Sequence, residues 1–431
     1  MENRMVIFED DKYGNFYPLA YLRPIYSLRP GIRTLAEKII DGFSGYKPTL
    51  FCRPEIENLV LETSIYPVNK FDSPKFDELI FINGRLKIDK EFTDALKSAG
   101  KNAFIMSDGN LAAIKIIGGF TPEELADLNR GELGELANKL QKRSELLELD
   151  LKFYNYLWDF VTAIDSAIID DFEFLRKQTS SQIDALQKMI LNNSIKEKFP
   201  GVHFIKQENI YISSDAEILP GVVLDAEKGP IFIGGRARIE PHSYIIGPTY
   251  IGKESIIVGG RISGSSIGTV CRIGGELEES IIQGYTNKYH AGFIGHSYIG
   301  EWVNFGAMTT NSDLKNNYGS VKVAVNGKEI DTGYLKVGSF IGDFTKTAIG
   351  TLLNTGINIG ISCNILADGL VAEKEIPSFT WLSSRHKMEY RFNKALDVIE
   401  RTMSRRNKIL SESLKKRLEE LSHVKVQLKL E

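Results

Sequence analysis

The sequence predicts an α/β domain, then a left-handed parallel β-helix, then a C-terminal helical tail. Three observations lead to this prediction. Strand-like runs alternate with helical pieces before residue 120, and apolar residues recur at helical spacing after residue 377. Between these regions an isoleucine returns at every sixth position, at Ile233, Ile239, Ile245, Ile251 and Ile257. A period of six fits neither a helix nor a single strand, but it fits short strands that turn a corner every six residues.

The first region, residues 1–120, is predicted to be the α/β domain. Its strand-like runs are Met5–Phe8, Leu79–Ile82, Ala103–Met106 and Ala112–Ile117. A helix should begin at Thr121, because this N-cap residue is followed by a proline at the first helical position and by Glu124 three residues later. We expect a helical connector over residues 121–200. Its apolar residues predict a packing face: Leu146, Leu147, Leu151, Tyr154, Leu157, Trp158 and Val161.

The six-residue period extends the β-helix to residues 207–378. It returns at Phe293, Ile299 and Phe305, and again at Leu353, Ile359, Ile365 and Val371. Each of these side chains is expected to point into the prism, where one residue per side and coil forms a central stack. The interruption from Leu314 to Tyr334 predicts a projecting loop. Residues 379–431 predict an amphipathic helical tail, in one or two segments, that docks on the prism or on a neighbouring subunit.

Composition excludes several classes of protein. The chain has 431 residues, of which 42% are apolar and 25% charged, as in ordinary soluble proteins. A net charge of −3 and the lack of a basic tract predict no binding of nucleic acid. No run of eighteen apolar residues occurs, so we expect no membrane span. Cys52, Cys271 and Cys363 form no CxxC pair, which favours a reducing cytoplasm and argues against a zinc site on cysteines.

Several motifs carry a resemblance to a known family. The chain opens with VIFEDD and LRPIYSLRPGIRTLAEK, continues with FINGR, and holds GYTNKYHAGFIGHSYIGEWVN in the β-helix. With these motifs it resembles the hexapeptide-repeat acyltransferases, most closely a divergent form of the bifunctional UDP-N-acetylglucosamine pyrophosphorylase/glucosamine-1-phosphate N-acetyltransferases. The resemblance implies acetyl-CoA-dependent N-acetylation of an amino-sugar phosphate, a nucleotidyltransferase domain that makes a UDP-sugar, and a homotrimer. It is strongest over residues 207–385.

The resemblance assigns the acetyl-transfer chemistry to particular residues. In KYHAGFIG, His290 matches the general base, and a neutral imidazole can take a proton from an attacking amine near neutral pH. Phe293 stands where the family carries a tyrosine that touches the substrate, so one hydroxyl contact is lost. Asn304 and Asn311 match family positions that line the acceptor pocket, but asparagines also favour tight turns, and that alternative stays open. The resemblance implies these acceptor-binding residues: Asn304 and Asn311 for the sugar, Lys315 for its phosphate, and Arg261, with Arg272 as its competitor, as a phosphate clamp.

Acetyl-CoA binds along the later coils in the resembling family. Lys346 and Arg385 are the cations expected to face its phosphates. Gly342 and Asp343 match a turn that approaches the cofactor.

The N-terminal domain departs from the resembling family because the usual Gly-rich loop, GxGTRM, is absent. Instead Thr34 and Glu37 form a capping-box signature after two arginines and a glycine, which predicts a phosphate cradle at a helix N-terminus. The alternative is a loop whose arginines pair with Glu9, Asp10 and Asp11. The expected nucleotide-binding residues are Arg23, Arg29, Gly31, Arg33, Lys38, Asn83 and Gly84.

The same resemblance implies Mg²⁺, which the family holds with the aspartate of a GD motif. Here Asn83-Gly84-Arg85 places an arginine at that position. Either Asp10 or Asp11 then supplies the carboxylate for Mg²⁺, or this half binds a sugar nucleotide without turning it over.

Two other functions are alternatives to acetyl transfer. γ-Class carbonic anhydrases also use trimers of left-handed β-helices, but they bind zinc with three histidines. His290 and His296 are six residues apart, too far along a coil to share a metal, and the remaining β-helix histidines are His203 and His242. The second alternative is a non-catalytic trimeric scaffold that binds a sugar nucleotide.

Overall fold

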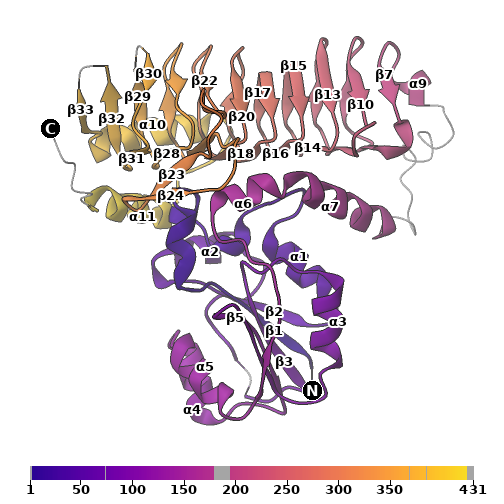
Figure 1. Ribbon diagram of the computed structural model, residues 1–431, viewed down its shortest axis with the longest axis vertical. Helices are drawn as coiled ribbons and strands as arrows, with labels where there is room; N and C mark the ends of the chain where they lie inside the picture. Colours follow the sequence, from indigo (N-terminus) through magenta and orange to yellow (C-terminus); the bar gives the residue numbers. More distant parts are fainter. Residues whose placement is uncertain (1, 73, 179–194, 368, 385, 425–431) are drawn as a thin grey trace. The chain divides into compact units, whose positions relative to one another are not determined.

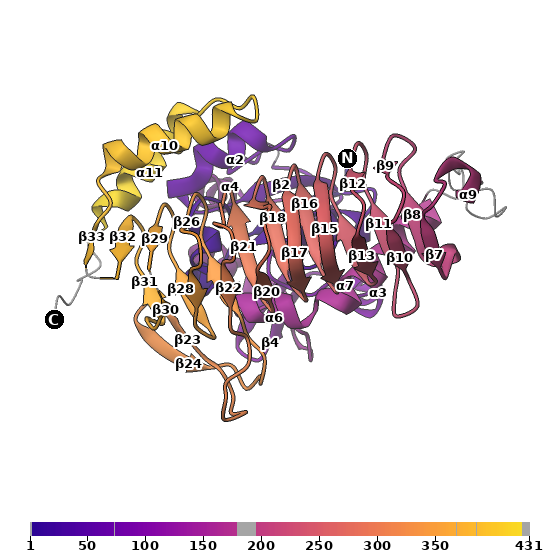
Figure 2. The ribbon, with the colours of Figure 1, turned by 90° about the horizontal axis from the view of Figure 1, so that it is seen from above.

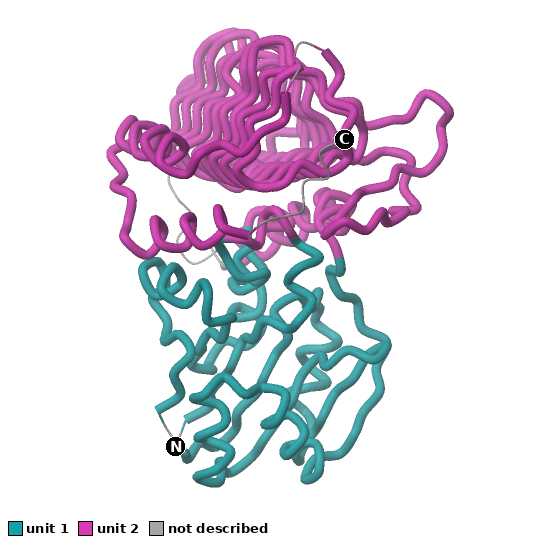
Figure 3. The backbone as a smooth tube through the Cα atoms, turned by 90° about the vertical axis from the view of Figure 1, so that its left-hand side faces the viewer, with its two compact units in different colours: residues 1–16, 22–28, 33–155 teal, residues 17–21, 29–32, 156–431 magenta. Residues whose placement is uncertain are grey.

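The computed structural model describes residues 2–72, 74–178, 195–367, 369–384 and 386–424. They fall into two compact units (Figure 3). Unit 1 comprises the residues up to 16, residues 22–28 and residues 33–155, and unit 2 comprises residues 17–21, residues 29–32 and the chain from 156 onward. Among the described residues, no helix is both long enough and apolar enough to cross a membrane.

Unit 1 is an α/β domain built on one six-stranded sheet of order β2-β1-β3-β5-β4-β6 (Figure 1). β1 lies parallel to β2 and β3, whereas β5 is antiparallel to its two neighbours. The four strands that the sequence predicts are confirmed. The strands are β1 (Arg4–Phe8), β2 (Lys47–Phe51), β3 (Glu78–Asn83), β4 (Ala103–Ser107), β5 (Asn110–Ile117) and β6 (Glu145–Glu148).

Two helices of unit 1 begin where their caps predict. α1 (Leu35–Gly42) follows a complete capping box between Thr34 and Glu37, and α4 (Pro122–Asn129) follows one between Thr121 and Glu124. In each box the side chains satisfy N–H groups that the first helical turn leaves free. The other α-helices are α2 (Glu57–Thr63), α3 (Lys90–Ser98) and α5 (Leu133–Gln141).

The predicted helical face of the connector is wrong in its first part. Leu146 and Leu147 lie in β6, which extends the sheet by pairing parallel with β4. A short apolar run has no clear period, so strand and helix cannot be distinguished from it. Unit 1 runs to Asn155, and the expected boundary at residue 120 falls inside it. In unit 2, α6 (Leu157–Thr162) and α7 (Ile164–Gln178) are helical as expected.

Unit 2 is dominated by the predicted parallel β-helix, whose coils have three faces (Figures 1 and 2). We call them faces A, B and C. β15 (Ile256–Ser263) and β17 (Arg272–Glu278) turn the corner from A to B within one strand. Face A otherwise holds β9 (Glu217–Ile218), β12 (Arg238–Ile239), β19 (Asn287–Lys288), β26 (Lys346–Thr347), β29 (Asn364–Leu366) and β32 (Thr380–Ser383).

Faces B and C complete each coil. Face B holds β7 (His203–Ile205), β10 (Val223–Asp225), β13 (Ser243–Ile246), β20 (Phe293–Gly295), β22 (Thr310–Asn311), β27 (Leu352–Leu353) and β30 (Leu370–Val371). Face C is a nine-stranded sheet: β8 (Ile210–Ile212), β11 (Ile231–Ile233), β14 (Thr249–Ile251), β16 (Ser266–Thr269), β18 (Ile281–Gly284), β21 (Tyr298–Glu301), β25 (Ser339–Ile341), β28 (Ile357–Ile359) and β31 (Glu375–Ile376). A short helix, α9 (Ile195–Lys198), precedes the first coil.

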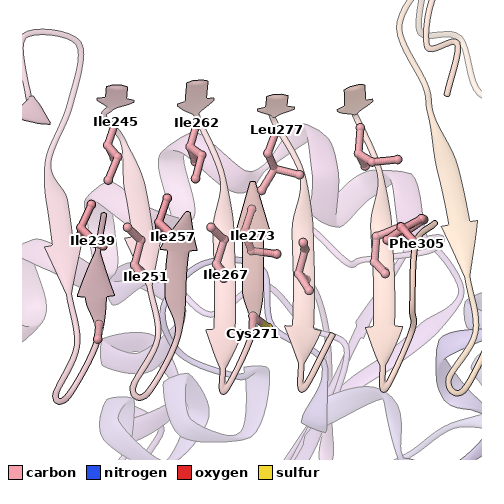
Figure 4. Close-up of a cluster of buried hydrophobic side chains, with 14 of the residues drawn as sticks. Ile239, Ile245, Ile251, Ile257, Ile262, Ile267, Cys271, Ile273, Leu277 and Phe305 are labelled. Carbon is pink, nitrogen blue, oxygen red and sulfur yellow. The ribbon is translucent and has the colours of Figure 1, made fainter. Parts of the chain in front are cut away.

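The predicted interior stack is confirmed with one exception (Figure 4). All five isoleucines from Ile233 to Ile257 are fully buried in one apolar core. Phe293 is the exception: it pairs with Glu276 on the outside, and Ile294 fills the interior position in register with Leu277. The period slips here because the coils shorten, so the strict six-residue count no longer marks the inward side.

The interruption after residue 313 is a β-hairpin and not a freely projecting loop. β23 (Lys322–Val325) and β24 (Lys328–Asp331) pair antiparallel. Asn358 Nδ2 donates to the Ala324 carbonyl at 2.9 Å, and the Gly327 N–H donates to Glu375 at 2.8 Å. The hairpin is thus held against β28 and β31 of its own chain.

The helical tail is confirmed as two segments, α10 (Phe392–Ser404) and α11 (Glu412–His423). β32 and β33 (Lys387–Glu389) form an antiparallel pair ahead of it, so the tail becomes helical only at Phe392. The ring of Phe392 packs on Phe379 of the β-helix, with 6.2 Å between centroids.

Candidate functional site

His290 stands at the corner between faces A and B, after β19 and before β20. Its side chain is exposed, and its ring meets Tyr289 edge-on at 5.3 Å. This placement leaves the imidazole accessible to a substrate that approaches the corner.

A buried lysine holds the turn that carries His290. Lys288 is in register with Ile273 and takes an interior position of the stack. Its Nζ donates to the carbonyls of Gly274 and Gly292, each at 2.7 Å. Burial lowers the pKa of Lys288 to about 8. Sequence reasoning missed this residue, because Lys288 lies off the six-residue count and its register with Ile273 follows from the shortened coils.

Face A brings together three of the predicted residues, Arg272, Asn304 and Lys346. Arg272, Asn287, Asn304 and Lys346 follow one another in register across successive coils. Asn287 Nδ2 donates to Asn304 Oδ1 at 2.7 Å, which links the two amides into a pair. Arg272 Nη1 donates to the carbonyls of Glu254 and Cys271.

A cavity of about 280 Å³ lies between this row and the end of α10, and both belong to unit 2. Burial lowers the pKa of Lys346 to about 8, and its Nζ donates to the Phe344 carbonyl at 3.2 Å. Sequence reasoning missed the contribution of the tail, because no local pattern tells where a helix docks. The lining residues are Tyr285, Asn287, Trp302, Val303, Asn304, Lys346, Thr402, Arg405 and Arg406.

Face B carries a different row, in which Arg261, Glu276 and Phe293 are aligned. Arg261 Nη1 lies 3.3 Å from Glu276 Oε1 and 3.3 Å from Glu278 Oε2. A phosphate bound by Arg261 would have to compete with two carboxylates. Arg261 and Arg272 lie on different faces, so the structure does not make them alternatives for one clamp.

Four other predicted residues are engaged within the β-helix. Asn311 is buried in β22, and its amide exchanges two hydrogen bonds with the backbone of Gly295; its φ is not positive, so it is not the turn residue of the structural alternative. Asp343 is fully buried and accepts from the Glu301 N–H, while a Cβ on Gly342 would lie 2.8 Å from the Gly360 backbone. Lys315 donates to the Ser320 carbonyl within the hairpin excursion. Arg385 lies outside the described residues.

His296 is a buried ionic centre that sequence reasoning considered only as a zinc ligand. Its Nδ1 lies 2.7 Å from Asp313 Oδ2, and its Nε2 lies 3.0 Å from Glu279 Oε2. Burial alone would lower the pKa of His296, but the two carboxylates outweigh it and raise the pKa to about 9. The protonated ring therefore links one coil to Asp313, where the hairpin excursion leaves the β-helix.

Among the residues that the structure describes, no three-histidine zinc site is formed. His290 and His296 occupy different corners of one coil. Each acidic or histidine cluster able to hold a metal, within the described part of the chain, contains at most one histidine.

In the N-terminal region, the residues predicted to form a phosphate cradle are divided between the two units. Arg29 and Gly31 belong to unit 2, where the Arg29 N–H donates to Tyr298 at 2.8 Å and Ser266 Oγ donates to the Gly31 carbonyl. A Cβ on Gly31 would lie 2.7 Å from the Ala167 backbone, so this glycine permits close packing rather than approach to a phosphate. The remaining predicted residues lie in unit 1: Arg23, Arg33, Lys38, Asn83 and Gly84. Of these, Arg33 forms an ion pair with Asp41.

The residues of unit 1 do not fit the Mg²⁺ site that the sequence implies. Asp10 Oδ2 accepts from Arg85 Nε at 2.7 Å and from Asn83 Nδ2 at 2.9 Å. The Arg85 side chain is fully buried, so its guanidinium supplies the positive charge beside this carboxylate. Position 84 has no room for a side chain, because a Cβ there would lie 2.9 Å from Tyr26. Asp11 is exposed and lies outside this network.

A second cavity, of about 380 Å³, opens in unit 1 beyond the carboxyl ends of β1 and β2. Asp10 and Asp11 line it, together with Glu9, Tyr13 and Arg53, which sequence reasoning did not assign to binding. Glu9 and Arg53 form a buried ion pair of 2.6 Å, and burial still raises the pKa of Glu9. The carboxyl edge of parallel strands is the usual ligand site of α/β sheets.

Comparison with known proteins relates both units to enzymes. Residues 5–180 match the family model described as sugar nucleotidyl transferase. A bifunctional sugar-1-phosphate nucleotidylyltransferase/acetyltransferase of Sulfurisphaera tokodaii is 33% identical over 156 residues, covering 33% of this chain and 37% of the relative. The bifunctional protein GlmU of Prochlorococcus marinus is 23% identical over 354 residues, covering 75% of this chain and 69% of the relative.

A third relative gives the same picture. GlmU of Methanocaldococcus jannaschii is 29% identical over 158 residues, covering 37% of this chain and 33% of the relative. For two of these three proteins the aligned segment spans only about a third of the relative's length. Residues 5–180 are therefore similar to sugar nucleotidyl transferase domains, and the chain is related to the bifunctional nucleotidylyltransferase/acetyltransferases, as its motifs predict.

Proposed function

We propose that unit 2 transfers the acetyl group of acetyl-CoA to the amine of an amino-sugar phosphate, such as glucosamine 1-phosphate. The observation that carries this proposal is the exposed His290, on a corner whose backbone the buried Lys288 holds. The names of the bifunctional relatives add support.

In the proposed reaction, His290 acts as the general base. Its neutral imidazole accepts a proton from the amine as the nitrogen attacks the thioester carbonyl. The new C–N bond forms, the C–S bond breaks, and the CoA thiolate leaves and takes up a proton. Asn304 is proposed to orient the sugar, since its amide lies on face A, next to the His290 corner.

For unit 1 we propose nucleotidyl transfer from UTP to a sugar 1-phosphate, with release of pyrophosphate. The family match and the cavity beyond β1 and β2 support it. Arg53, whose guanidinium lies over Tyr13 at 4.5 Å and bonds to Glu9, is proposed as a phosphate-binding cation there. No step is assigned to a metal, because Arg85 and Asn83 already bond Asp10.

The test is an assay of the full chain with glucosamine 1-phosphate, acetyl-CoA, UTP and Mg²⁺ that follows free thiol and pyrophosphate separately. His290→Asn should lower thiol release by at least about 100-fold, as expected for loss of a general base. His242→Asn is the matched control, because His242 is also an exposed histidine outside the strands of the β-helix, ahead of β13.

The outcomes separate the two activities. Thiol release that survives in His290→Asn would refute the assigned base. Thiol without pyrophosphate would confine catalysis to unit 2, and neither product would refute this choice of substrates.

We further propose that the protein is a cytoplasmic homotrimer. The β-helix is consistent with trimers, and the three cysteines are free thiols. Light scattering after size exclusion should give three times the mass of 48.3 kDa. A monomer would contradict the proposed assembly.

A further inference from the structure

Within the described part of the chain, the cavity between face A and α10 is lined by three cations and by no carboxylate. Lys346 comes from the β-helix, and Arg405 and Arg406 come from the end of the tail helix. Among the described residues, neither of these arginines has a carboxylate within ion-pair distance, and the Nε of Arg406 is buried without a hydrogen-bond partner. Like charges gathered in a partly desolvated space repel one another, and an anion would relieve that repulsion.

A fourth cation adds to this field. Arg272 is the neighbour of Asn287 in the face A row. Burial, followed by the positive charge of Arg406, lowers the pKa of Arg272. Arg272 does not line the cavity, and Glu254 partly offsets its charge, but it lies within electrostatic reach of Arg406. Three positive charges thus line the cavity with a fourth beside them, and an anionic ligand would supply negative charge there.

A purely structural explanation accounts for only part of this arrangement. Arginines at the end of α10 interact favourably with the helix dipole. That effect explains Arg405, the C-cap residue, and its neighbour Arg406. It does not explain why the opposite wall presents Lys346 and the Asn287–Asn304 amide pair.

The remaining walls indicate what kind of anion would fit. Tyr285 and Trp302 are stacked with their centroids 4.3 Å apart, and both line the cavity. An aromatic wall beside a cationic one suits a ligand with a flat ring and phosphates. A volume of about 280 Å³ is at the small end for ligand sites and suits part of a nucleotide better than a whole coenzyme.

We propose that this cavity binds the diphosphate of a nucleotide, with Lys346, Arg405 and Arg406 as its phosphate ligands. The tail is thereby a functional part of the site and not only a cover for the β-helix. Two ligands of the proposed function share this chemistry: CoA, as acetyl donor, and a uridine diphosphate sugar. The site lies near His290, since Asn287 precedes His290 by three residues, at most about 10 Å of chain.

The test is isothermal titration of the full-length protein with CoA, with UDP and with inorganic pyrophosphate. The variant Arg405→Gln/Arg406→Gln removes two charges from the cavity. The matched control Arg401→Gln/Lys408→Gln removes two charges from exposed positions of the same tail that do not line it. Both variants keep unit 1 unchanged, so their difference isolates this cavity from any nucleotide site there.

We expect the cavity variant to weaken binding of pyrophosphate and of one nucleotide by roughly 10- to 100-fold, and the control by less than about 2-fold. If the affinity for CoA falls and that for UDP does not, the site belongs to the acetyl donor. If the affinity for UDP falls and that for CoA does not, it belongs to the nucleotide sugar. Equal affinities in the cavity variant and the control would overturn the proposal. Binding is measured without turnover, so an inactive protein that still binds these anions would refute the proposed function and leave this site standing.

Discussion

At the scale of single residues, the interior lysine beside His290 is the most informative. Lys288→Met should keep the packing of the stack, because methionine has a similar length. It removes the Nζ bonds to the His290 and Gly292 carbonyls of the turn and to the Gly274 carbonyl of β17. We expect kcat for acetyl transfer to fall about 10-fold while KM changes less than about 2-fold, since a loosened base affects the chemical step more than binding. Steady-state kinetics measures both constants.

Lys288 acts on His290 through the backbone, so the test is whether the substitution changes kcat or KM. A rise in KM at constant kcat would show that Lys288 shapes the binding surface instead. Unchanged kinetics would mean that the turn holds its shape without the ammonium group.

The network around His296 predicts that unit 2 loses stability as pH rises. The folded pKa of about 9 exceeds the ordinary histidine value, so protonated His296 stabilises the fold fully below about pH 6.5. That contribution, on the order of 1–3 kcal/mol, is lost as pH rises through about 9. Among the described residues, the charged groups facing the ring or its two carboxylates are Asp313, Glu279, Glu278, Asp165 and Lys336.

The comparison is between wild type and His296→Gln in thermal unfolding at pH 6, 7.5 and 9.5. The wild type should be more stable by several degrees at pH 6, and the gap should shrink towards pH 9.5. A gap that stays constant over this range would refute the assigned charge state.

At the scale of elements, the hairpin of β23 and β24 depends on a glycine beneath it. Gly356 has a positive φ of 61°, and a Cβ there would lie 2.5 Å from the Lys322 carbonyl. Gly350 has a φ of 74° with nothing within 4 Å of its Cβ position, so it is a matched control. Both alanine substitutions carry the backbone cost of a left-handed conformation, about 1 kcal/mol.

Only Gly356→Ala should also push β23 off the β-helix. We expect it to lower the melting temperature by several degrees more than Gly350→Ala and to expose residues 314–336 to proteases. Limited proteolysis with mass spectrometry reads this directly. Equal cleavage in both variants would show that the hairpin does not rest on this contact.

The elements also show what local sequence can and cannot predict. The capping boxes at Thr34 and Thr121 were predictable because each depends only on residues within one turn. The role of Arg29 and Gly31 was not, because the loop that holds them is used by Tyr298 and Ser266, far away in sequence. Sequence reasoning assigned that loop to a phosphate, whereas tertiary packing uses it within unit 2.

At the scale of the whole molecule, the β-helix was predictable and its surface rows were not. The six-residue period marks the interior because every coil repeats the same burial. Which outer residues align depends on the length of each coil, and the coils differ in length. The interior Ile257 pairs with Ile273, whereas the interior Ile299 pairs with Ile341 across the hairpin excursion. The cationic cavity also needs the docked tail. His290 could be found from its motif, but Arg405 and Arg406 could not.

The division into two units predicts that the two proposed activities can be lost separately. Arg53→Met leaves Glu9 buried without its partner, which typically costs 3–5 kcal/mol, and it should abolish pyrophosphate release. Unit 2 has an apolar core of its own, so thiol release should stay within about 2-fold of wild type.

The double variant Glu9→Gln/Arg53→Met removes the unpaired charge and separates folding from function. If it restores the thermal stability of unit 1 without pyrophosphate release, Arg53 is needed for the reaction and not only for the fold. Restored release would instead show that Arg53 serves only to neutralise Glu9. Thiol release that falls together with pyrophosphate release in either variant would contradict the independence of the units, because damage to one core would then reach the chemistry of the other.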